Sequence, residues 1–205
     1  MELKRVVVTG FGAITPIGNN AQEYWENLVK GVSGAAPITL FDSTNFKTKF
    51  ACEVKNFNPL DHFEKKEAKK MDRNTQLGVV AAREAVSHSR IIEDQVDKNR
   101  VGVIWGSGIG GLETFETEVL GWAKSEGIPR FNPFFIPKMI ADITPGHVSM
   151  EYGFHGPNYT TVSACASSTN ALIDAKMLLQ LGKADVIVCG GSEAAVTASG
   201  MGGFN

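Results

Sequence analysis

A stretch of small and hydroxyl-bearing residues around Cys165 constrains this chain more than any other feature. Residues 160–163 predict a short buried strand, and residues 166–181 predict a helix that Gly182 ends. Cys165 therefore lies at a strand-to-helix turn, where free backbone N–H groups and the helix dipole favour the thiolate. Its small neighbours leave room for a substrate at the sulfur. The pattern indicates a nucleophile, although a small cysteine packed under a helix start has the same local sequence.

The bulk properties are those of an ordinary globular protein. The chain has 205 residues, of which 43% are hydrophobic and 20% charged, with a net charge of −2. This length allows one sizeable domain or two small ones. We expect no nucleic-acid partner, because no basic surface is evident, and no membrane partner, because no apolar run is long enough to span a bilayer. With no signal peptide evident, the expected location is cytoplasmic.

The cysteines fit neither a disulfide framework nor a metal site. They are three in number, at positions 52, 165 and 189. Such wide spacing is typical of a reducing compartment and matches no zinc pattern. We expect Cys52 and Cys189 to be packing residues, and we expect no metal or other cofactor.

Apolar strand-like runs alternate with helical patterns along the chain. This order predicts an α/β fold with a mixed, mostly parallel sheet flanked by helices and a long insertion at about 107–138. The expected strands are residues 5–9, 50–54, 101–105, 160–163 and 184–189, and the expected helices are residues 21–30, 73–89, 112–125, 138–152 and 166–181.

Two glycine-rich turns resemble dinucleotide-binding fingerprints only in part. In the first, Thr15 replaces the third glycine and Pro16 interrupts the helix. The second, residues 106–111, satisfies the glycine spacing, but the required second strand with an acidic residue does not follow. We interpret it as a turn in which backbones approach closely. Nucleotide binding remains a distant alternative.

An aromatic, proline-rich segment at 128–137 belongs to the core, to a subunit interface or to the wall of an apolar pocket, and we favour the interface or the pocket. His147 and His155 lie near the cysteine in sequence, and either could act as a base for Cys165. A structural or surface role is the more common one for an isolated histidine.

Taken together, the motifs resemble those of the thiolase-fold condensing enzymes, and most closely the 3-oxoacyl-(acyl-carrier-protein) synthases of the type II elongating class. The resemblance covers residues 1–205 as the N-terminal half of such a domain. It is carried by Val7-Val8-Thr9-Gly10 with Gly18, Gly106-Ser107-Gly108-Ile109-Gly110-Gly111, Asn132-Pro133-Phe134-Phe135, Gly156-Pro157, Ser163-Ala164-Cys165-Ala166-Ser167, Ala184-Asp185 through Gly190-Gly191-Ser192-Glu193, and Gly202-Gly203-Phe204.

The resemblance implies decarboxylative condensation in fatty acid elongation. An acyl-carrier-protein thioester would acylate Cys165, and a malonyl thioester would then lose carbon dioxide and attack the acyl group. It also implies a homodimer, no cofactor, and an acyl pocket. Ile109 and Phe204 match positions beside that pocket, and Phe134 and Phe135 match a segment brought to it by a second subunit.

One departure from the family pattern is large. The family also uses two histidines, a lysine and a glycine-rich gate from its C-terminal half, and no position here matches them. The chain ends in a glycine-rich apolar run, which suggests that it is cut from something longer. We therefore expect the 205 residues alone not to condense, and to oligomerise or dissolve poorly.

Some alternatives remain open at this stage. The resemblance also fits a polyketide ketosynthase, a decarboxylating homologue, or a non-catalytic partner such as a chain-length factor, although those partners lack the cysteine. Lys65, Lys66, Lys69 and Lys70 are either part of a basic dock for an acidic carrier protein or a solvated helix face. The acyl-chain length preference cannot be read from the sequence.

Overall fold

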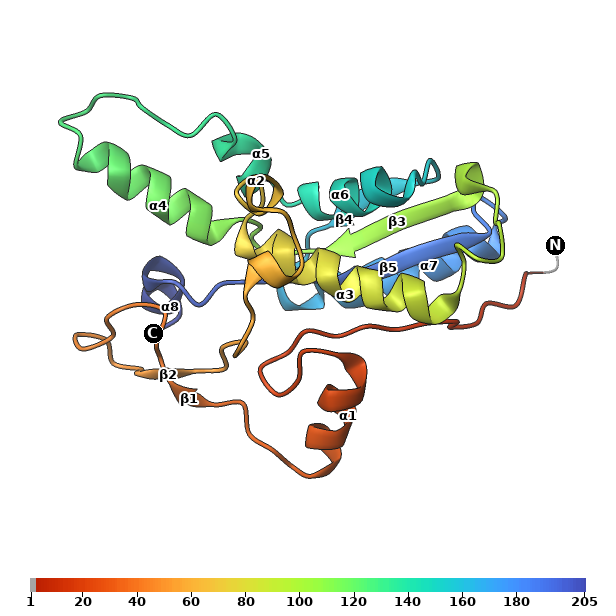
Figure 1. Ribbon diagram of the computed structural model, residues 1–205, viewed down its shortest axis with the longest axis horizontal. Helices are drawn as coiled ribbons and strands as arrows, with labels where there is room; N and C mark the ends of the chain where they lie inside the picture. The colour runs from red at the N-terminus through yellow and green to blue at the C-terminus, as the bar shows by residue number, and fades with distance from the viewer. Residues whose placement is uncertain (1–2) are drawn as a thin grey trace.

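A three-stranded parallel sheet forms the centre of the molecule. In the computed structural model, which describes residues 3–205, the strands are β3 (Val101–Gly106), β4 (Asn158–Thr161) and β5 (Val186–Gly191). Their order is β4-β3-β5, with Ile104 opposite both Tyr159 and Cys189 (Figure 1). The predicted α/β class is confirmed. Both pairings of this sheet are parallel, so among the described residues it lacks the antiparallel member of a mixed sheet.

Helices cover both faces of this sheet. α3 (Arg73–Ser89) and α6 (Ile143–Tyr152) lie on one face, and α7 (Ser167–Gln180) lies on the other (Figure 1). Successive residues of a strand point to opposite faces. All six residues of β3 are buried, and its four side chains larger than glycine divide accordingly between two apolar cores. The α3–α6 core contains Val101, Val103 and Trp105, and the α7 core contains Ile104, Ala171 and Ala175.

Helix α3 forms over the residues that its sequence predicts. Asp72 caps its start by accepting a hydrogen bond from the Asn74 N–H at 2.9 Å. Gly78 faces the sheet, and a Cβ atom there would lie 2.7 Å from both Ser192 Oγ and Thr144 Cγ2. The absence of a side chain at Gly78 thus lets α3 pack closely against the residues beside the sheet.

The remaining elements surround this three-layer centre. The insertion between β3 and α6 holds two helices, one of which projects away from the sheet (Figure 1). The other elements are α1 (Ala21–Val29), α2 (Lys65–Ala68), α4 (Leu112–Ala123), α5 (Phe135–Met139), α8 (Ala198–Phe204), the antiparallel pair β1 (Ala36–Pro37) and β2 (Phe50–Ala51), and the 3-10 turns Pro59–Asp61, Lys98–Arg100 and Ala164–Ala166.

The predicted first strand is wrong. Residues 5–9 form no ladder in the described chain, and Val8 is 84% exposed. The segment just after them instead lies against α3, where the Ala13 N–H donates to Glu84 Oε2 at 2.9 Å. Gly10 and Gly12 make close approaches to the backbone carbonyls of α3 there. β-branched residues favour an extended backbone, but a strand also needs a hydrogen-bonded neighbour.

Two further predictions need correction. The strand expected at 50–54 shortens to β2, which leaves Cys52 exposed rather than packed. The strand expected at 160–163 starts earlier, at Asn158, and it is an edge strand of exposed and half-buried residues. Both segments lack a second neighbouring strand in residues 3–205, and burial of a strand depends on such neighbours.

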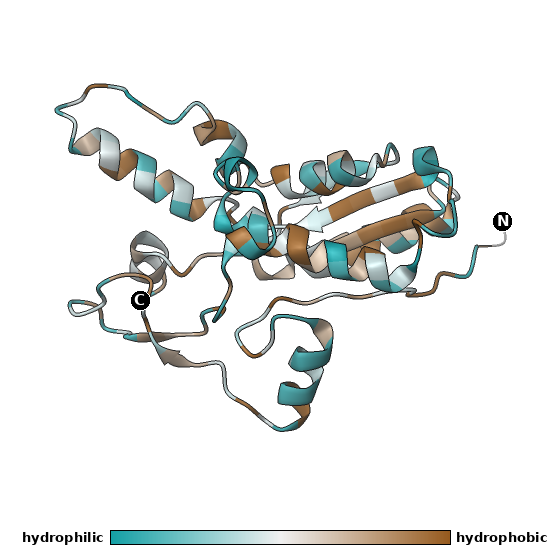
Figure 2. Cartoon of the chain, viewed as in Figure 1, coloured by the Kyte–Doolittle hydropathy of each residue, from teal (hydrophilic) through white to brown (hydrophobic). Residues whose placement is uncertain are grey.

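Hydropathy follows the layers. The central strands β3 and β5 are largely hydrophobic, whereas the peripheral helix α1 is largely hydrophilic (Figure 2). Among the described residues, no helix is both long enough and apolar enough to cross a bilayer.

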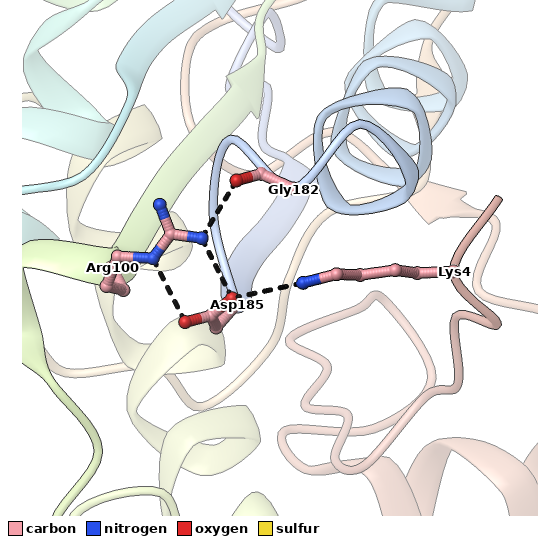
Figure 3. A network of polar contacts seen from close by, with 4 residues as sticks. All are labelled: Lys4, Arg100, Gly182 and Asp185. Atoms are coloured by element: carbon pink, nitrogen blue, oxygen red, sulfur yellow. Dashed lines mark hydrogen bonds and ion pairs between the residues drawn. The ribbon is translucent and has the colours of Figure 1, made fainter. Parts of the chain in front are cut away.

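A polar network joins the N-terminal segment to the sheet. Arg100, at the start of β3, donates to both carboxylate oxygens of Asp185 at 3.0 and 2.9 Å, and to the Gly182 carbonyl at 2.8 Å (Figure 3). Lys4 Nζ lies 3.7 Å from Asp185 Oδ1. The hydrogen bonds from Arg100 are the main reason that the pKa of Asp185 is lowered. This network therefore ties the α7–β5 connection to the strand beside it.

We predict that Asp185→Asn destabilises the fold only where Asp185 would be ionised. A carboxylate with a lowered pKa stabilises the folded state above its unfolded-state pKa of about 3.9, and that contribution disappears as the pH falls through the folded-state pKa. Because the group is exposed, we expect the melting temperature at pH 7 to fall by on the order of 1 °C. Thermal scans at pH 7 and pH 2.5, with exposed Asp94→Asn as control, measure this. An equal loss at both pH values would contradict it.

Candidate functional site

The carboxyl ends of the three parallel strands meet at one edge of the sheet. The loops that follow β3, β4 and β5 begin there, and they are joined by backbone hydrogen bonds. Ser107 N–H donates to the Thr161 carbonyl at 3.3 Å, and Ser192 N–H donates to the Gly106 carbonyl at 3.1 Å. In open α/β sheets this edge is the usual place for ligands.

Cys165 lies in this edge, in the single turn of 3-10 helix between β4 and α7. Its side chain is free and exposed. The residue before it, Ala164, has a φ of +51°, in the left-handed region that non-glycine residues rarely adopt. Strained backbone of this kind clusters at functional sites, where the surrounding structure enforces it.

The hydroxyl of Ser167 holds the turn in this conformation. It accepts a hydrogen bond from the Ser163 N–H at 2.8 Å and donates one to the Ala164 carbonyl at 2.7 Å. Thr161 Oγ1 donates to the Ser167 carbonyl at 2.8 Å, and Asn170 Nδ2 donates to Ser163 Oγ at 2.6 Å. Ser167 is only 3% exposed, so its own hydroxyl is shielded from water. The strained residue is therefore enclosed by a complete local network.

Two glycines let α7 begin directly on the strand ends. A Cβ atom on Gly106 would overlap the Ser168 nitrogen, and one on Gly191 would lie 2.6 Å from Ser168 Cβ. The prediction that the glycines after β3 allow close backbone approach is confirmed at Gly106. The start of α7 is therefore fixed against both β3 and β5.

The geometry suits an accessible nucleophile. No side chain caps the start of α7, although the Ala166 and Ser167 N–H groups already donate to the Ser163 and Ala164 carbonyls in the turn. The positive end of a 14-residue helix favours negative charge there, whether on a thiolate or on an oxyanion. An exposed thiol at such a helix start can attack a carbonyl carbon, and the helix dipole favours the oxygen that becomes negative.

Of the other predicted site residues, Ile109 reaches the same edge. It lies in the loop after β3 with 46% of its surface exposed. Gly108 and Ile109 both donate their N–H groups to Glu193 Oε2, at 2.7 and 3.0 Å. A Cβ atom on Gly108 would also lie 3.7 Å from the Ala164 carbonyl, which places this loop beside the cysteine turn.

The three predicted phenylalanines lie on other elements. Phe135 stacks on Phe131 with ring centroids 5.3 Å apart, and Lys70 Nζ lies 5.3 Å from the ring centre of Phe134. Phe204 ends α8 and is 80% exposed. In residues 3–205 no hydrogen bond or aromatic contact links any of them to Cys165. The contacts described thus link Phe134 and Phe135 to their own neighbours.

Two cavities of about 280 and 380 Å³ lie near the start of α3 and α4. Both are lined by Arg73 and Glu113, and the smaller also touches Glu193. Burial, with the nearby Asp72 carboxylate, raises the pKa of Glu113. Neither cavity is lined by Cys165 or Ile109, so neither is the acyl tunnel that the resemblance implies.

Neither candidate histidine is placed to act on Cys165. The backbone N–H of His155 donates to the Lys98 carbonyl, near the start of β3 and thus at the opposite edge of the sheet. His147 lies on α6 on the α3 side, where burial lowers its pKa and the charges facing it are Glu67, Glu151 and Lys70. No group of three or more metal-ligating side chains occurs in the described residues.

Sequence reasoning missed the roles of two residues. Ser167 and Glu193 both belong to motifs that carry the family resemblance, but those motifs alone do not predict the hydrogen bonds that the two side chains make. A buried serine one turn after a strand end and an acidic residue after a double glycine are the signals that could have indicated them.

Comparison with known proteins places this chain in one family. Residues 3–205 match the family model of the beta-ketoacyl synthase N-terminal domain. The chain is 46% identical to a 3-oxoacyl-[acyl-carrier-protein] synthase 2 of Staphylococcus aureus (strain COL), over 98% of this chain and 49% of that protein. It thus spans about half the length of the curated relatives it matches.

Solved structures of ketosynthases also superpose on this chain. The ishigamide ketosynthase/chain length factor superposes with a TM-score of 0.87 at 30% identity, covering 98% of this chain and 50% of the other. A type II PKS acyl-carrier protein in complex with its ketosynthase gives a TM-score of 0.82 at 27% identity, covering 97% and 53%. The predicted thiolase-like fold is confirmed by these ketosynthases.

We predict that Ser167→Ala loosens the cysteine turn. The change leaves the half-buried hydrogen bonds to the Ser163 N–H and the Ala164 carbonyl unmade, which should cost about 0.5–1.5 kcal/mol of unfolding free energy. Urea unfolding measures this loss, and alkylation of Cys165 should slow in parallel. Ser168→Ala is the matched control, because it removes a hydroxyl from the next residue but keeps the Cβ atom that packs on Gly191. Equal effects of the two variants would refute the role of Ser167.

Proposed function

The chain belongs to the beta-ketoacyl synthase family, and on that premise we propose that it is the nucleophile-bearing N-terminal part of a 3-oxoacyl-(acyl-carrier-protein) synthase. The observation that carries the proposal is the exposed Cys165 in a strained turn, at the start of α7 and at the ligand-binding edge of the sheet. The 46% identity to a curated synthase supports this class of substrate.

The first step is acyl transfer. The Cys165 thiolate attacks the carbonyl carbon of an acyl-carrier-protein thioester, and the electron pair moves onto the carbonyl oxygen. The backbone N–H of Cys165 is one donor to that oxyanion. The tetrahedral adduct then collapses, the carbon–sulfur bond to the carrier breaks, and the carrier thiolate takes up a proton. The acyl group remains on Cys165.

The second step is decarboxylative condensation. Malonyl-carrier protein loses carbon dioxide, and the resulting carbanion attacks the carbonyl carbon of the acyl-Cys165 thioester. A 3-oxoacyl-carrier protein forms and the Cys165 thiolate is released. None of the four histidines of the chain lies at the Cys165 edge among the contacts described, so we propose that the 205 residues alone perform only the first step.

Ile109, Phe134, Phe135 and Phe204 are the proposed lining of the acyl pocket. Each methylene of an acyl chain that leaves water for such a lining contributes roughly 0.8 kcal/mol. We propose that Phe134 and Phe135 serve the pocket of a second copy in a homodimer. In support, Phe134 is 41% exposed, so its ring is accessible to a partner chain. A monomer mass by light scattering at micromolar concentration would contradict this part.

The carrier protein and the compartment complete the proposal. A related ketosynthase is seen in complex with an acyl-carrier protein, and we propose the same kind of partner here. Three free cysteines are consistent with a cytoplasmic location, which cell fractionation would test.

A polyketide ketosynthase is the second candidate, because the ishigamide ketosynthase/chain length factor shares the fold at 30% identity. The higher identity to the 3-oxoacyl synthase favours the fatty acid class. A non-catalytic chain-length factor is disfavoured by Cys165 itself, since such partners lack the cysteine. The second candidate would be favoured if Cys165 accepted an acyl group from a polyketide thioester but not from a simple saturated acyl thioester.

We predict that Cys165 reacts faster than the other cysteines. Cys52 is equally free and exposed, so it is an internal control for accessibility, whereas burial raises the pKa of Cys189. Limiting iodoacetamide at pH 7, mapped by peptide mass spectrometry, should modify Cys165 at least about tenfold faster than Cys52. Equal rates would refute an activated thiol.

The 205-residue chain also tests the proposal that it performs acyl transfer but not condensation. The chain is incubated with two substrates, a carrier protein that bears a saturated acyl chain and malonyl-carrier protein. Mass spectrometry should then show acyl-Cys165 accumulating without 3-oxoacyl product. Cys165→Ala should show neither. Product formation by the 205-residue chain would contradict the proposed division, and absence of acyl transfer would contradict the proposed function.

A further inference from the structure

A single carboxylate joins the loop after β5 to the loop after β3. Glu193 Oε2 accepts hydrogen bonds from the N–H groups of Gly108 and Ile109, at 2.7 and 3.0 Å. These residues are separated from Glu193 by 85 and 84 positions in sequence. Hydrogen bonds to an ionised acceptor are roughly twice as strong as neutral ones. The contact therefore fixes two loops that the chain itself does not connect.

Gly108 lies between this carboxylate and the cysteine turn. A Cβ atom at position 108 would lie 2.7 Å from Glu193 Oε2 and 3.7 Å from the Ala164 carbonyl. Only glycine lets the backbone approach the carboxylate so closely. The loop is thus held against Glu193 on one side and against the residue before Cys165 on the other.

The same loop has a second anchor on its inner side. The Gly110 N–H donates to Ser107 Oγ at 3.0 Å, and Ser107 is 2% exposed. The side chain of Ile109, by contrast, is 46% exposed and belongs to neither apolar core. Its position is therefore set by the backbone anchors rather than by packing.

We infer that Glu193 is a positioning residue that holds Ile109 beside Cys165 and thereby sets how the site discriminates between acyl chains. The inference rests on the proposed function, in which Ile109 lines the acyl pocket. Glu193 is itself exposed, so it acts through its carboxylate and not as a core residue. If the carboxylate is removed, the Gly108–Ile109 backbone is free to move. The wall of the proposed acyl pocket that Ile109 forms beside the Cys165 sulfur then becomes less rigid.

Hydrogen exchange tests the contact itself. In the 205-residue chain, Glu193→Ala should raise the exchange rates of the Gly108 and Ile109 amides by about tenfold or more. Glu193→Gln keeps an acceptor oxygen and should give a smaller increase. Glu116→Gln is the matched control, since Glu116 also accepts from a backbone N–H, that of Ser199 at 2.6 Å, but on α8. It should leave exchange at Gly108 and Ile109 unchanged.

Chain-length discrimination tests the role. Alkylation of Cys165 by iodoacetamide and by N-dodecyl iodoacetamide gives a long-to-short rate ratio for each variant. Loosening the wall should lower this ratio by about threefold or more in Glu193→Ala, with partial rescue in Glu193→Gln. A purely structural loss of order would change both rates by the same factor. Circular dichroism checks that the variants fold, and if Glu193→Ala does not, Glu193→Gln carries both readouts.

Two results would overturn the inference. One is unchanged exchange at Gly108 and Ile109 in the Glu193 variants, and the other is faster exchange with an unchanged rate ratio. Failure of the proposed function has a different signature, because Cys165 of the unmodified chain would then react no faster than Cys52 with either reagent.

Discussion

The close contact between the strand ends and the start of α7 is the constraint on which the rest of this structure depends. Gly106 and Gly191 have no Cβ atoms, so the first residues of α7 settle directly onto β3 and β5. A helix that began even slightly further away would separate the Ser167 hydroxyl from the Ser163–Ala164 backbone that it binds. The left-handed conformation of Ala164 would then have nothing to enforce it. Glycines in the strands thus determine the geometry of a cysteine in another element.

Much of the fold could be predicted because its signals are local. Asp72 and the helical spacing after it define α3, the β-branched run at 101–105 defines β3, and Gly182 follows the last turn of α7. Residues 5–9 have an equally clear local pattern and yet form no strand, because pairing is decided by residues elsewhere in the chain. The same cause shortened β2. Sequence periodicity reports which backbone conformation is favoured, but not whether a neighbour is present.

The candidate site divides in a similar way. Cys165 and the closeness of the glycine turn could be predicted, since both follow from residue type at an element boundary. The Glu193 contacts could not, because they join residues more than eighty positions apart through a side chain and backbone amides. Ile109 was expected from the family resemblance alone, and the structure supplies the hydrogen bonds that explain its place.

The strain at Ala164 has a consequence for the order of events during folding. An isolated α7 segment has no reason to adopt a left-handed residue before its first turn, because that conformation is stabilised only by contacts made after the helix is buried. The strained arrangement around Cys165 is therefore a property of the assembled tertiary structure and not of the peptide. A newly made chain would expose Cys165 in an ordinary extended or helical backbone until its layers pack, and the strained turn would form only once the chain is folded.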